Sequence, residues 1–527
     1  MAQAQDWWRG AVIYQIYPRS FMDGNGDGIG DIPGITERLG QIADLGVDAI
    51  WLSPVFTSPM ADMGYDVENY TDIDPVFGTI ADFDAMIAKA HALGLKVMID
   101  QVLSHSSDRH PIFQQSRQSR GNDKADWYVW ADPKPDGSAP NNWQAVFGGI
   151  AWEWEARRGQ YYLHNFLKEQ PDWNFHNPEV QEYLLGTMRF WLERGVDGFR
   201  LDTANFYFHD KLLRDDAASP RPEDRNEPVP YRRQYHLFSK NQPENLVFLQ
   251  KMRALLDEFE GRTLVGEIGE SHHPIEIMGQ YTSDNRLHMA YSFEMLDKKF
   301  TARHFRQQIE GFFGGAPAGW PCWAFSNHDV IRHVTRWQDH GADQDALAKL
   351  SAAMLLSLEG SICLYQGEEL GQTETELEYS ELTDPQGLRF WPEDKGRDGC
   401  RTPMVWDADA PNGGFSTAGR TWLPVKDPQL SRAANGQDVR AFYRRMLALR
   451  RDEPALRQGR TEFLDTPEPV LAFRRGKSLL CVFNLSPADT ELELPSGVEA
   501  LVSERSAVNG TRLHLQGNGV LIGKLAA

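Results

Sequence analysis

Residues 35–54 read ITERLGQIADLGVDAIWLSP, and this stretch indicates the fold class. Leu39, Ile42 and Leu45 lie on one face of a predicted amphipathic helix. Gly46 follows where a left-handed C-terminal cap is expected, and AIWLSP continues as an apolar strand. The order of helix, glycine and buried strand is typical of an α/β protein with parallel strands.

The same unit recurs in residues 83–102 (FDAMIAKAHALGLKVMIDQV) and 180–202 (VQEYLLGTMRFWLERGVDGFRLD). Apolar runs in VIYQIYP, TLVGEI, HMAYSF, PCWAFSN and SICLYQGEE bring the predicted strands to eight, the number in a (β/α)8 TIM barrel. A doubly wound open sheet shows the same alternation. The acidic side chains favour the barrel, because they fall at strand C-terminal ends, which a barrel gathers around one pocket. These acids are Asp100, Asp202, Glu267, Asp329 and Glu368.

The spacing of the units predicts the domain organisation. The length of chain between the second and third units is roughly double that between the first and second, which predicts an inserted domain B at 105–175. A polar, Gly/Pro-rich stretch predicts a second insertion at 367–425, after strand eight. Short apolar strands predict a C-terminal all-β domain of the sandwich type at 457–527. The catalytic barrel would then comprise 1–104 and 176–456.

Composition narrows the range of partners. A net charge of −21 disfavours nucleic acid and anionic membranes, and leaves a neutral small oligosaccharide acceptable. The N-terminal MAQAQDWWRG lacks the pattern of a signal peptide, and no apolar run is long enough to cross a bilayer. The four cysteines form no C-x-x-C pair, so we expect a cytoplasmic protein with reduced thiols. We expect it to be a monomer or dimer.

Three strand ends carry acids suited to breaking an acetal, which needs one carboxylate at the anomeric carbon and one acid for the departing oxygen. In GFRLD, Arg200 and Asp202 lie on one face of a strand, and the arginine keeps the aspartate ionised, as a nucleophile requires. Glu267 in LVGEIG has an apolar setting that raises the pKa of an acid. SNHD adds His328 and Asp329.

These segments together resemble the α-amylase family of glycoside hydrolases, in its oligo-1,6-glucosidase and α-glucosidase branch. The family's four marker segments are matched by DQVLSH (100–105), GFRLD (198–202), GEIG (266–269) and SNHD (326–329). QPDWN (170–174) resembles a fifth segment that is typical of this branch. The resemblance runs over essentially the whole chain and implies the barrel, domain B and the C-terminal β domain.

The resemblance also implies the roles of individual residues. Asp202 would be the nucleophile, Glu267 the general acid/base and Asp329 the transition-state stabiliser. Substrate-binding positions would be Asp62, Tyr65, His105, Phe147, Phe166, Arg200, Thr203 and His328, together with Arg397 and Arg401. Either Arg397 or Arg401 would clamp the non-reducing glucose through Asp62. A pocket closed beyond that sugar would make the enzyme exo-acting.

A separate loop reads DGNGDGIGD, with Asp23, Asn25, Asp27 and Asp31 at positions one, three, five and nine and Ile29 at seven. Alternate oxygen ligands and a backbone carbonyl at position seven suit a hard cation, Ca²⁺ or else Mg²⁺. A Gly/Asp-rich turn without an ion is the alternative. Related glucosidases hold an ion in this loop, so we expect a structural metal and no organic cofactor.

Two positions depart from the family pattern or bear on linkage preference. Ser104 stands where the first marker usually has asparagine. Family members that prefer α-1,6 links tend to have valine directly after the nucleophile, so Thr203 at that position favours α-1,4 links. We therefore expect a retaining α-glucosidase that acts on maltose-like or sucrose-like substrates, with transglucosylation. The alternatives are an oligo-1,6-glucosidase and a sucrose-acting transferase or isomerase, although the RLDRD segment of isomerases is missing. A non-catalytic, transporter-associated relative is the remote alternative.

Overall fold

The computed structural model describes residues 6–433 and 438–525. Residues 1–5, 434–437 and 526–527 lie outside the described residues. Residues 1–5 are part of the N-terminal segment in which no signal peptide was expected. Eight parallel strands form the central sheet, in the order β13-β12-β9-β5-β2-β1-β15-β14. A parallel bridge from Ala290 to Pro321 brings its two edges together, so the predicted barrel is confirmed. The strands are β1 (Val12–Ile16), β2 (Ala49–Leu52), β5 (Lys96–Gln101), β9 (Gly198–Leu201), β12 (Thr263–Ile268), β13 (Met289–Ser292), β14 (Cys322–Ala324) and β15 (Ser361–Tyr365).

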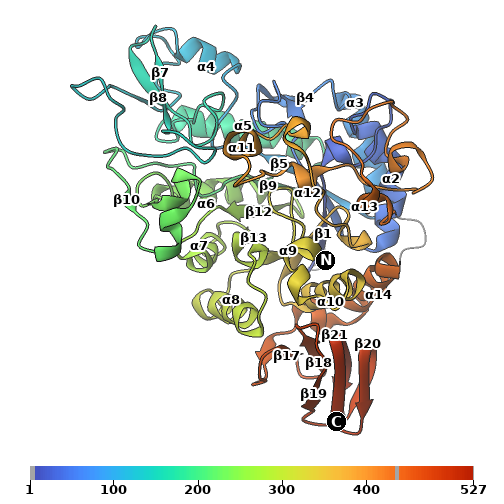
Figure 1. Ribbon diagram of the computed structural model, residues 1–527. Coiled ribbons are helices and arrows are strands. Elements are labelled where there is room, and N and C mark those ends of the chain that lie inside the picture. Colours follow the sequence, from blue (N-terminus) through green and yellow to red (C-terminus); the bar gives the residue numbers. More distant parts are fainter. Residues whose placement is uncertain (1–5, 434–437, 526–527) are drawn as a thin grey trace.

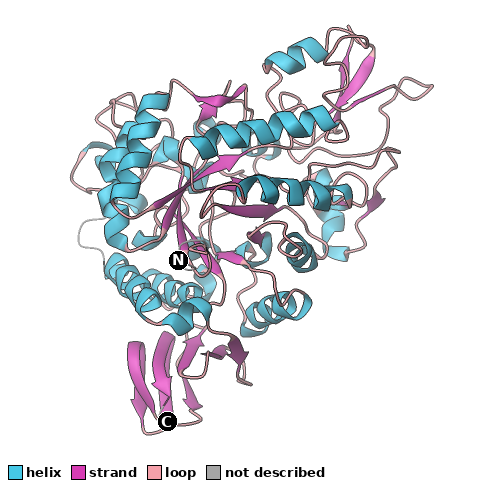
Figure 2. Ribbon diagram, turned by 180° about the vertical axis from the view of Figure 1, so that it is seen from behind, coloured by secondary structure: helices cyan, strands magenta, loops and turns pink. Residues whose placement is uncertain are grey.

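Helices surround these strands (Figure 2). They pack their apolar faces on the sheet because side chains three and four residues apart share one helix face; Leu39, Ile42 and Leu45 are buried in this way. Gly46 caps the first helix at φ 98°, a left-handed conformation that favours glycine. The helices are α2 (Ile32–Leu45), α3 (Ile80–Ala92), α5 (Pro178–Glu193), α6 (Glu244–Leu256), α7 (Pro274–Tyr281), α8 (Ala302–Gly315), α9 (His333–Arg336), α10 (Gln344–Ser357) and α14 (Asp438–Asp452), with short turns η1 (Pro18–Ser20), η4 (Phe293–Leu296) and η5 (Gln338–His340).

Three excursions extend from the barrel (Figure 1). The stretch between β5 and α5 holds α4 (Pro111–Ser116) and a three-stranded sheet of β6 (Trp130–Ala131), β7 (Trp152–Glu155) and β8 (Gln160–Leu163). The stretch after β9 holds β10 (Ala217–Ala218), η2 (Pro222–Asn226), η3 (Pro230–Arg233) and β11 (Gln234–Tyr235). The stretch after β15 holds η6 (Glu368–Leu370), η7 (Tyr379–Glu381), α11 (Pro385–Phe390), α12 (Asp398–Arg401), η8 (Pro411–Gly414) and α13 (Asp427–Leu430). Apart from these three excursions, a small hairpin after β2 pairs β3 (Phe56–Thr57) with β4 (Asn69–Ile73).

The C-terminal part, below the barrel in Figure 1, is antiparallel β structure, as predicted. After α15 (Pro454–Gln458), six strands form one sheet: β16 (Thr461–Phe463), β17 (Val470–Arg475), β18 (Leu479–Asn484), β19 (Thr490–Glu493), β20 (Val498–Asn509) and β21 (Arg512–Leu525). Side chains alternate between its faces: Leu471 and Phe473 join the main core, whereas Val470 and Ala472 join a smaller cluster on the other face. In the described parts of the chain, no helix is both long and apolar enough to span a bilayer.

Candidate active site

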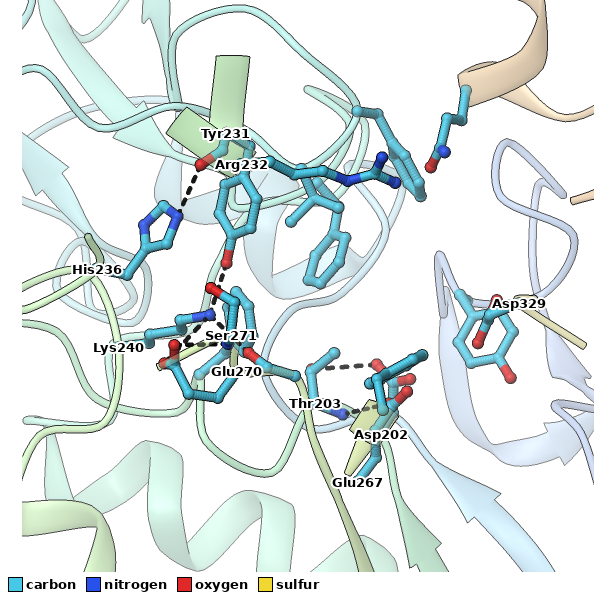
Figure 3. A pocket seen from close by; sticks show the side chains of 18 of the residues that line it. Asp202, Thr203, Tyr231, Arg232, His236, Lys240, Glu267, Glu270, Ser271 and Asp329 are labelled. Carbon is cyan, nitrogen blue, oxygen red and sulfur yellow. Dashed lines mark hydrogen bonds and ion pairs between the residues drawn. The ribbon is translucent and has the colours of Figure 1, made fainter. Parts of the chain in front are cut away.

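A cavity of about 370 Å³ opens at the carboxyl ends of the barrel strands (Figure 3). It brings together most of the side chains that the sequence predicts for the site: Asp62, Tyr65, His105, Phe147, Phe166, Asp202, Thr203, Glu267, Asp329 and Arg397. Arg200, His328 and Arg401 do not line it; they are buried behind its wall and contact the lining acids. Asp100 and Glu368 were also expected in this pocket, and that expectation is wrong for both. Asp100 pairs with the buried Arg200, and the Glu368 carboxylate turns back to accept the N–H of Tyr365 at 2.9 Å.

Arg200 connects the two acids at the centre of the cavity. Its Nη1 donates to Asp202 Oδ1 at 2.8 Å, and its Nη2 lies 2.7 Å from Glu267 Oε2. The same Nη1 donates to Asp100 Oδ1 at 2.8 Å, below the cavity floor. Arg200 is fully buried, so solvent does not screen these ion pairs. Asp202 directly follows β9 and Glu267 lies near the end of β12, and the pairing of these neighbouring strands brings their side chains together.

The environment of Glu267 keeps it protonated. Burial raises the pKa of Glu267 to about 8; the positive charge of Arg200 opposes this shift, and the negative charge of Asp202 adds to it. The backbone N–H of Thr203 also donates to Glu267 Oε2 at 3.0 Å. A carboxylic acid beside a carboxylate, in one cavity, is the pair that acid-catalysed displacement at an acetal requires.

Asp329 lies across the cavity from these two acids (Figure 3). Arg401 donates to Asp329 Oδ1 at 2.9 Å, Arg397 donates to the same oxygen at 3.3 Å, and His328 Nε2 lies 3.3 Å from the other oxygen. Burial acts to raise the pKa of Asp329, but His328 and the two guanidiniums hold that pKa well below its usual range. Asp329 is therefore a carboxylate at neutral pH.

Arg397, rather than Arg401, reaches the opposite wall. Its Nη2 donates to Asp62 Oδ1 at 2.8 Å and to Asp384 Oδ1 at 2.6 Å, and its guanidinium lies 4.7 Å above the ring of Phe147. Arg401 is 0% exposed and donates through Nε to the backbone carbonyl of His328. Of the two candidate arginines, Arg397 is thus the one that contacts Asp62 and faces the cavity.

Aromatic rings form the rest of the inner wall. The Tyr65 ring stacks on His328 at 5.4 Å between centroids, and its hydroxyl donates to Asp100 at 3.1 Å. His105 lies 5.1 Å from Phe166, centroid to centroid, and its Nε2 lies 2.9 Å from the backbone oxygen of Tyr65. Burial lowers the pKa of His105, so its ring is neutral near pH 7. Flat apolar faces beside carboxylates suit the binding of a sugar ring.

The outer wall comes largely from the segment 207–241, which carries none of the motifs that predicted the site. Its contribution is Arg221, Asp224, Glu227, Tyr231, Arg232, His236 and Lys240, joined by Glu270 and Ser271. Figure 3 shows Tyr231, Arg232, His236, Lys240, Glu270 and Ser271. The charges are paired: Lys240 Nζ lies 3.5 Å from Glu270, and Arg221 Nη2 lies 2.8 Å from Asp224. The available signal was the length and charge of the loop that follows β9 and Asp202.

The DGNGDGIGD loop is held by its own hydrogen bonds. Asp31 caps α2 by accepting the N–H of Gly34 at 2.7 Å, and Asp23 accepts the N–H of Asn25 at 3.1 Å. Asn25 and Asp27 each accept the N–H two residues ahead. Among the residues that the structure describes, no three His, Cys, Asp or Glu side chains form a group that could hold a metal. Asp23 accepts four hydrogen bonds, from the N–H groups of Asn25, Gly26 and Gly28 and from the Ser416 hydroxyl, so its lone pairs are occupied. Asp27 accepts one, from Ile29, and keeps lone pairs that suit a hard cation.

Comparison with known proteins identifies the family. The model of the alpha-amylase catalytic domain matches residues 15–459, which is most of the chain. The chain belongs to the alpha-amylase family. It is 58% identical to a "Probable alpha-glucosidase" of Rhizobium meliloti (strain 1021), over 93% of this chain and 91% of that protein. It is 37% identical to an "Oligo-1,6-glucosidase" of Heyndrickxia coagulans, over 93% of this chain and 94% of the relative.

Among solved structures, the crystal structure of the alpha-glucosyl transfer enzyme XgtA matches with a TM-score of 0.95 at 52% identity, over 99% of both chains. The family assignment confirms that the protein is a glycoside hydrolase of the alpha-amylase type. The barrel and the C-terminal sheet agree with this assignment.

Proposed function

We propose that this alpha-amylase family enzyme is a retaining, exo-acting α-glucosidase that releases α-glucose from the non-reducing end of short α-1,4-linked oligosaccharides. The observation that carries the proposal is the buried Arg200 guanidinium shared by Asp202 and Glu267, beside which Glu267 stays protonated. Retaining glycosidases hold their two carboxyl groups about 5–5.5 Å apart, and bonding to one guanidinium requires a short separation.

In this mechanism Asp202 attacks the anomeric carbon, forming a C–O bond while the glycosidic C–O bond breaks. Glu267 gives its proton to the departing oxygen and becomes a carboxylate. The Glu267 carboxylate then removes a proton from a water molecule, whose oxygen displaces Asp202 from the anomeric carbon. The second inversion restores the α configuration, both acids return to their starting states, and one molecule of water has been consumed.

The inner wall supports exo action on a terminal glucose. Asp62 and Arg397 pair at 2.8 Å and close the cavity beyond the place where one sugar ring fits against Tyr65 and Asp202. We assign sugar-hydroxyl contacts to Asp62, His105 and Arg397. Thr203, beside the nucleophile, supports a preference for α-1,4 over α-1,6 links, and the similarity to an oligo-1,6-glucosidase makes the α-1,6 preference the alternative.

Glucosyl transfer is a second candidate activity, favoured by the 52% identity to a glucosyl transfer enzyme over almost the whole chain. A retaining enzyme can transfer its glucosyl group to an alcohol in place of water, because the same intermediate accepts either nucleophile. The outer wall of paired charges offers donors and acceptors to a hydroxylated acceptor.

The test measures glucose release from maltose, isomaltose, sucrose and maltotriose, with NMR to follow the product anomer. We expect α-glucose as the first product, released fastest from maltose. Fastest release from isomaltose would contradict the linkage preference, and β-glucose would contradict the retaining mechanism. Asp202→Asn should abolish turnover of all four sugars, because the amide cannot form the glucosyl ester; full activity in that variant would overturn the assignment of the nucleophile.

We also propose that the DGNGDGIGD loop binds Ca²⁺ or Mg²⁺ as a structural ion, and that the protein is cytoplasmic. The side-chain oxygens of Asn25 and Asp27 support the ion, and four free, buried cysteines support a reducing compartment. Prolonged chelation should lower the Tm, and added Ca²⁺ should restore it, because an ion that binds only the folded state stabilises it. An unchanged Tm, with no metal found by elemental analysis, would contradict the site.

A further inference from the structure

A line of hydrogen bonds joins His105, in the inner wall, to Asp202. His105 Nδ1 lies 2.8 Å from Ser104 Oγ, and Ser104 Oγ lies 2.9 Å from Thr203 Oγ1. Thr203 Oγ1 lies 3.2 Å from Asp202 Oδ2, while Arg200 holds the other oxygen of Asp202. Ser104 is 1% exposed, so bulk water does not compete for its hydroxyl.

The direction of this line depends on which nitrogen of His105 carries the proton. Each hydroxyl has one proton to donate. If His105 Nδ1 carries the ring proton, Ser104 accepts it and donates to Thr203, and Thr203 donates to Asp202. If Nδ1 is unprotonated, Ser104 donates to it and Thr203 donates to Ser104. Asp202 Oδ2 then receives no hydrogen bond from Thr203.

The surroundings of His105 Nε2 offer a partner for either tautomer. The backbone oxygen of Tyr65, 2.9 Å away, can only accept a hydrogen bond, whereas Gln170 Nε2, 3.1 Å away, can only donate one. In the free protein the Tyr65 carbonyl is the closer of the two partners and favours a proton on Nε2; Gln170 directs its other amide proton to Asp62 Oδ2 at 3.2 Å. A sugar that binds at Asp62 changes these partners and can donate a hydroxyl to Nε2.

The backbone of Thr203 is shaped for this contact. Its φ is 42°, a left-handed conformation that is rare for a β-branched residue. This conformation directs its N–H to Glu267 Oε2 at 3.0 Å and its hydroxyl to Asp202 and Ser104. Uncommon backbone angles persist where surrounding contacts hold them, and they cluster at functional sites.

We propose that Ser104 and Thr203 are positioning residues that transmit the tautomer of His105 to Asp202, so that a sugar bound beside Asp62 gives the nucleophile a hydrogen bond. This inference rests on the proposed function. The proton count is the same in both states: the ring proton of His105 exchanges between its nitrogens through solvent, and the two hydroxyls rotate. In the free enzyme Thr203 donates to Ser104, and in the sugar-bound enzyme it donates to Asp202.

The relay would act on the second half of the reaction. Hydrolysis of the glucosyl ester regenerates the Asp202 carboxylate, and a hydroxyl donated to Oδ2 stabilises that developing charge. The hydrogen bond that a bound sugar gives to Asp202 therefore favours the second half of the reaction.

Two substitutions break the line with different results. Thr203→Val removes the hydroxyl and keeps the branched shape; hydrolysis of the glucosyl-enzyme should slow about tenfold, which is the size of one lost hydrogen bond to a charged group. Ser104→Ala leaves Thr203 with Asp202 as its only hydroxyl partner in both the free and the sugar-bound enzyme, so hydrolysis of the glucosyl-enzyme should keep its wild-type rate.

Rapid-quench kinetics with p-nitrophenyl α-glucoside separates the two steps, and Tm checks folding. The matched control is Ser106→Ala, a buried serine whose hydroxyl contacts Tyr128 and not His105, and it should change neither step. Thr203→Ser should restore the hydrolysis rate. ¹⁵N NMR of the wild-type enzyme should show the His105 proton move from Nε2 to Nδ1 when a glucose-ring inhibitor binds.

Unchanged hydrolysis of the glucosyl-enzyme in Thr203→Val would overturn the relay, because Thr203 would then give Asp202 no hydrogen bond in that step. An unchanged His105 tautomer on inhibitor binding would also overturn it. Failure of the proposed function is separate: the wild-type enzyme would then not hydrolyse the glucoside at all.

Discussion

Arg200 pairs with Asp100, Asp202 and Glu267 while fully buried, so one positive charge faces three carboxyl groups. Three buried carboxylates around one cation would repel one another, so some of these carboxyl groups stay protonated. Burial raises the pKa of Asp100 to about 7 and that of Glu267 to about 8, with Arg200 opposing and Asp202 adding to both shifts. Of these two acids, Glu267 alone lines the cavity, which supports its proposed role as the proton donor.

Activity should therefore fall on the alkaline side. Glu267 acts as an acid only while protonated, so kcat/KM on maltose should decline as pH rises through about 8. Glu267→Gln should lower kcat/KM on maltose by about 10²-fold or more, and by less on p-nitrophenyl α-glucoside, whose leaving group needs little protonation. Initial rates between pH 5 and 10 on both substrates check this; a rate on maltose that keeps rising through that range would contradict the assignment of Glu267.

Arg397 should affect substrate binding more than catalysis. Arg397→Lys keeps the charge but loses the planar fork that joins Asp62 to Asp384, so KM for maltose should rise about tenfold with a smaller change in kcat. Steady-state kinetics tests this, with the exposed Lys395→Ala as the control. An unchanged KM in Arg397→Lys would remove Arg397 from the proposed sugar contacts.

At the scale of elements, the stretch between β5 and α5 meets α11 over the cavity. The turn at Gly148 has φ 90°, and a Cβ there would lie 2.5 Å from the Phe390 ring, so only glycine fits. Arg389 donates to the carbonyl of Gly148 at 2.8 Å. Phe147, one residue earlier, lines the cavity beneath Arg397. This contact between two separate insertions thus places one wall of the cavity.

Loosening that contact should weaken substrate binding more than chemistry. Arg389→Ala removes the hydrogen bond to Gly148 and should raise KM for maltose a few-fold with kcat nearly unchanged, because Phe147 is less well held. Gly148→Ala should in addition lower the Tm, through backbone strain and the clash with Phe390. Arg157→Ala, on the same insertion and exposed, serves as the control. A reduced kcat at constant KM in Arg389→Ala would contradict this role.

At the scale of the whole molecule, one buried arginine connects the N-terminal part of the chain to two segments more than 340 residues further along it. Arg450, on α14, donates to the backbone carbonyls of Gly10, Leu356 and Gly360, and also to those of Leu358 and Leu456. It pairs with no carboxylate among the described residues, and burial lowers its pKa to about 9. These bonds join three segments: the residues just before β1, the C-terminal end of α10, and α15, which precedes the C-terminal sheet.

Arg450→Ala should destabilise the protein by about 3 kcal/mol or more, because several buried carbonyls lose their donor at once. Thermal unfolding followed by circular dichroism measures the effect, and the exposed neighbour Arg451→Ala is the control, expected within about 0.5 kcal/mol of the wild type. Equal Tm values for the two variants would show that Arg450 does not join these segments.

The local pattern of the sequence was enough to predict the barrel. Leu39, Ile42 and Leu45 face the core, Gly46 adopts the left-handed cap, and all eight predicted strands are present. The reason is physical: helix and strand periodicity and glycine caps depend on neighbours a few residues apart. Motifs at strand ends likewise located Asp202 and Glu267, since parallel strands in a barrel bring their carboxyl ends together.

The tertiary structure alone decided contacts between distant segments. It distinguished Arg397 from Arg401, placed the segment 207–241 in the cavity wall, and removed Glu368 from that wall. It also brought Ser104 within hydrogen-bonding distance of Thr203. Side-chain partners of this kind depend on how loops from different strands pack over the barrel, and that packing leaves no periodic trace in the sequence.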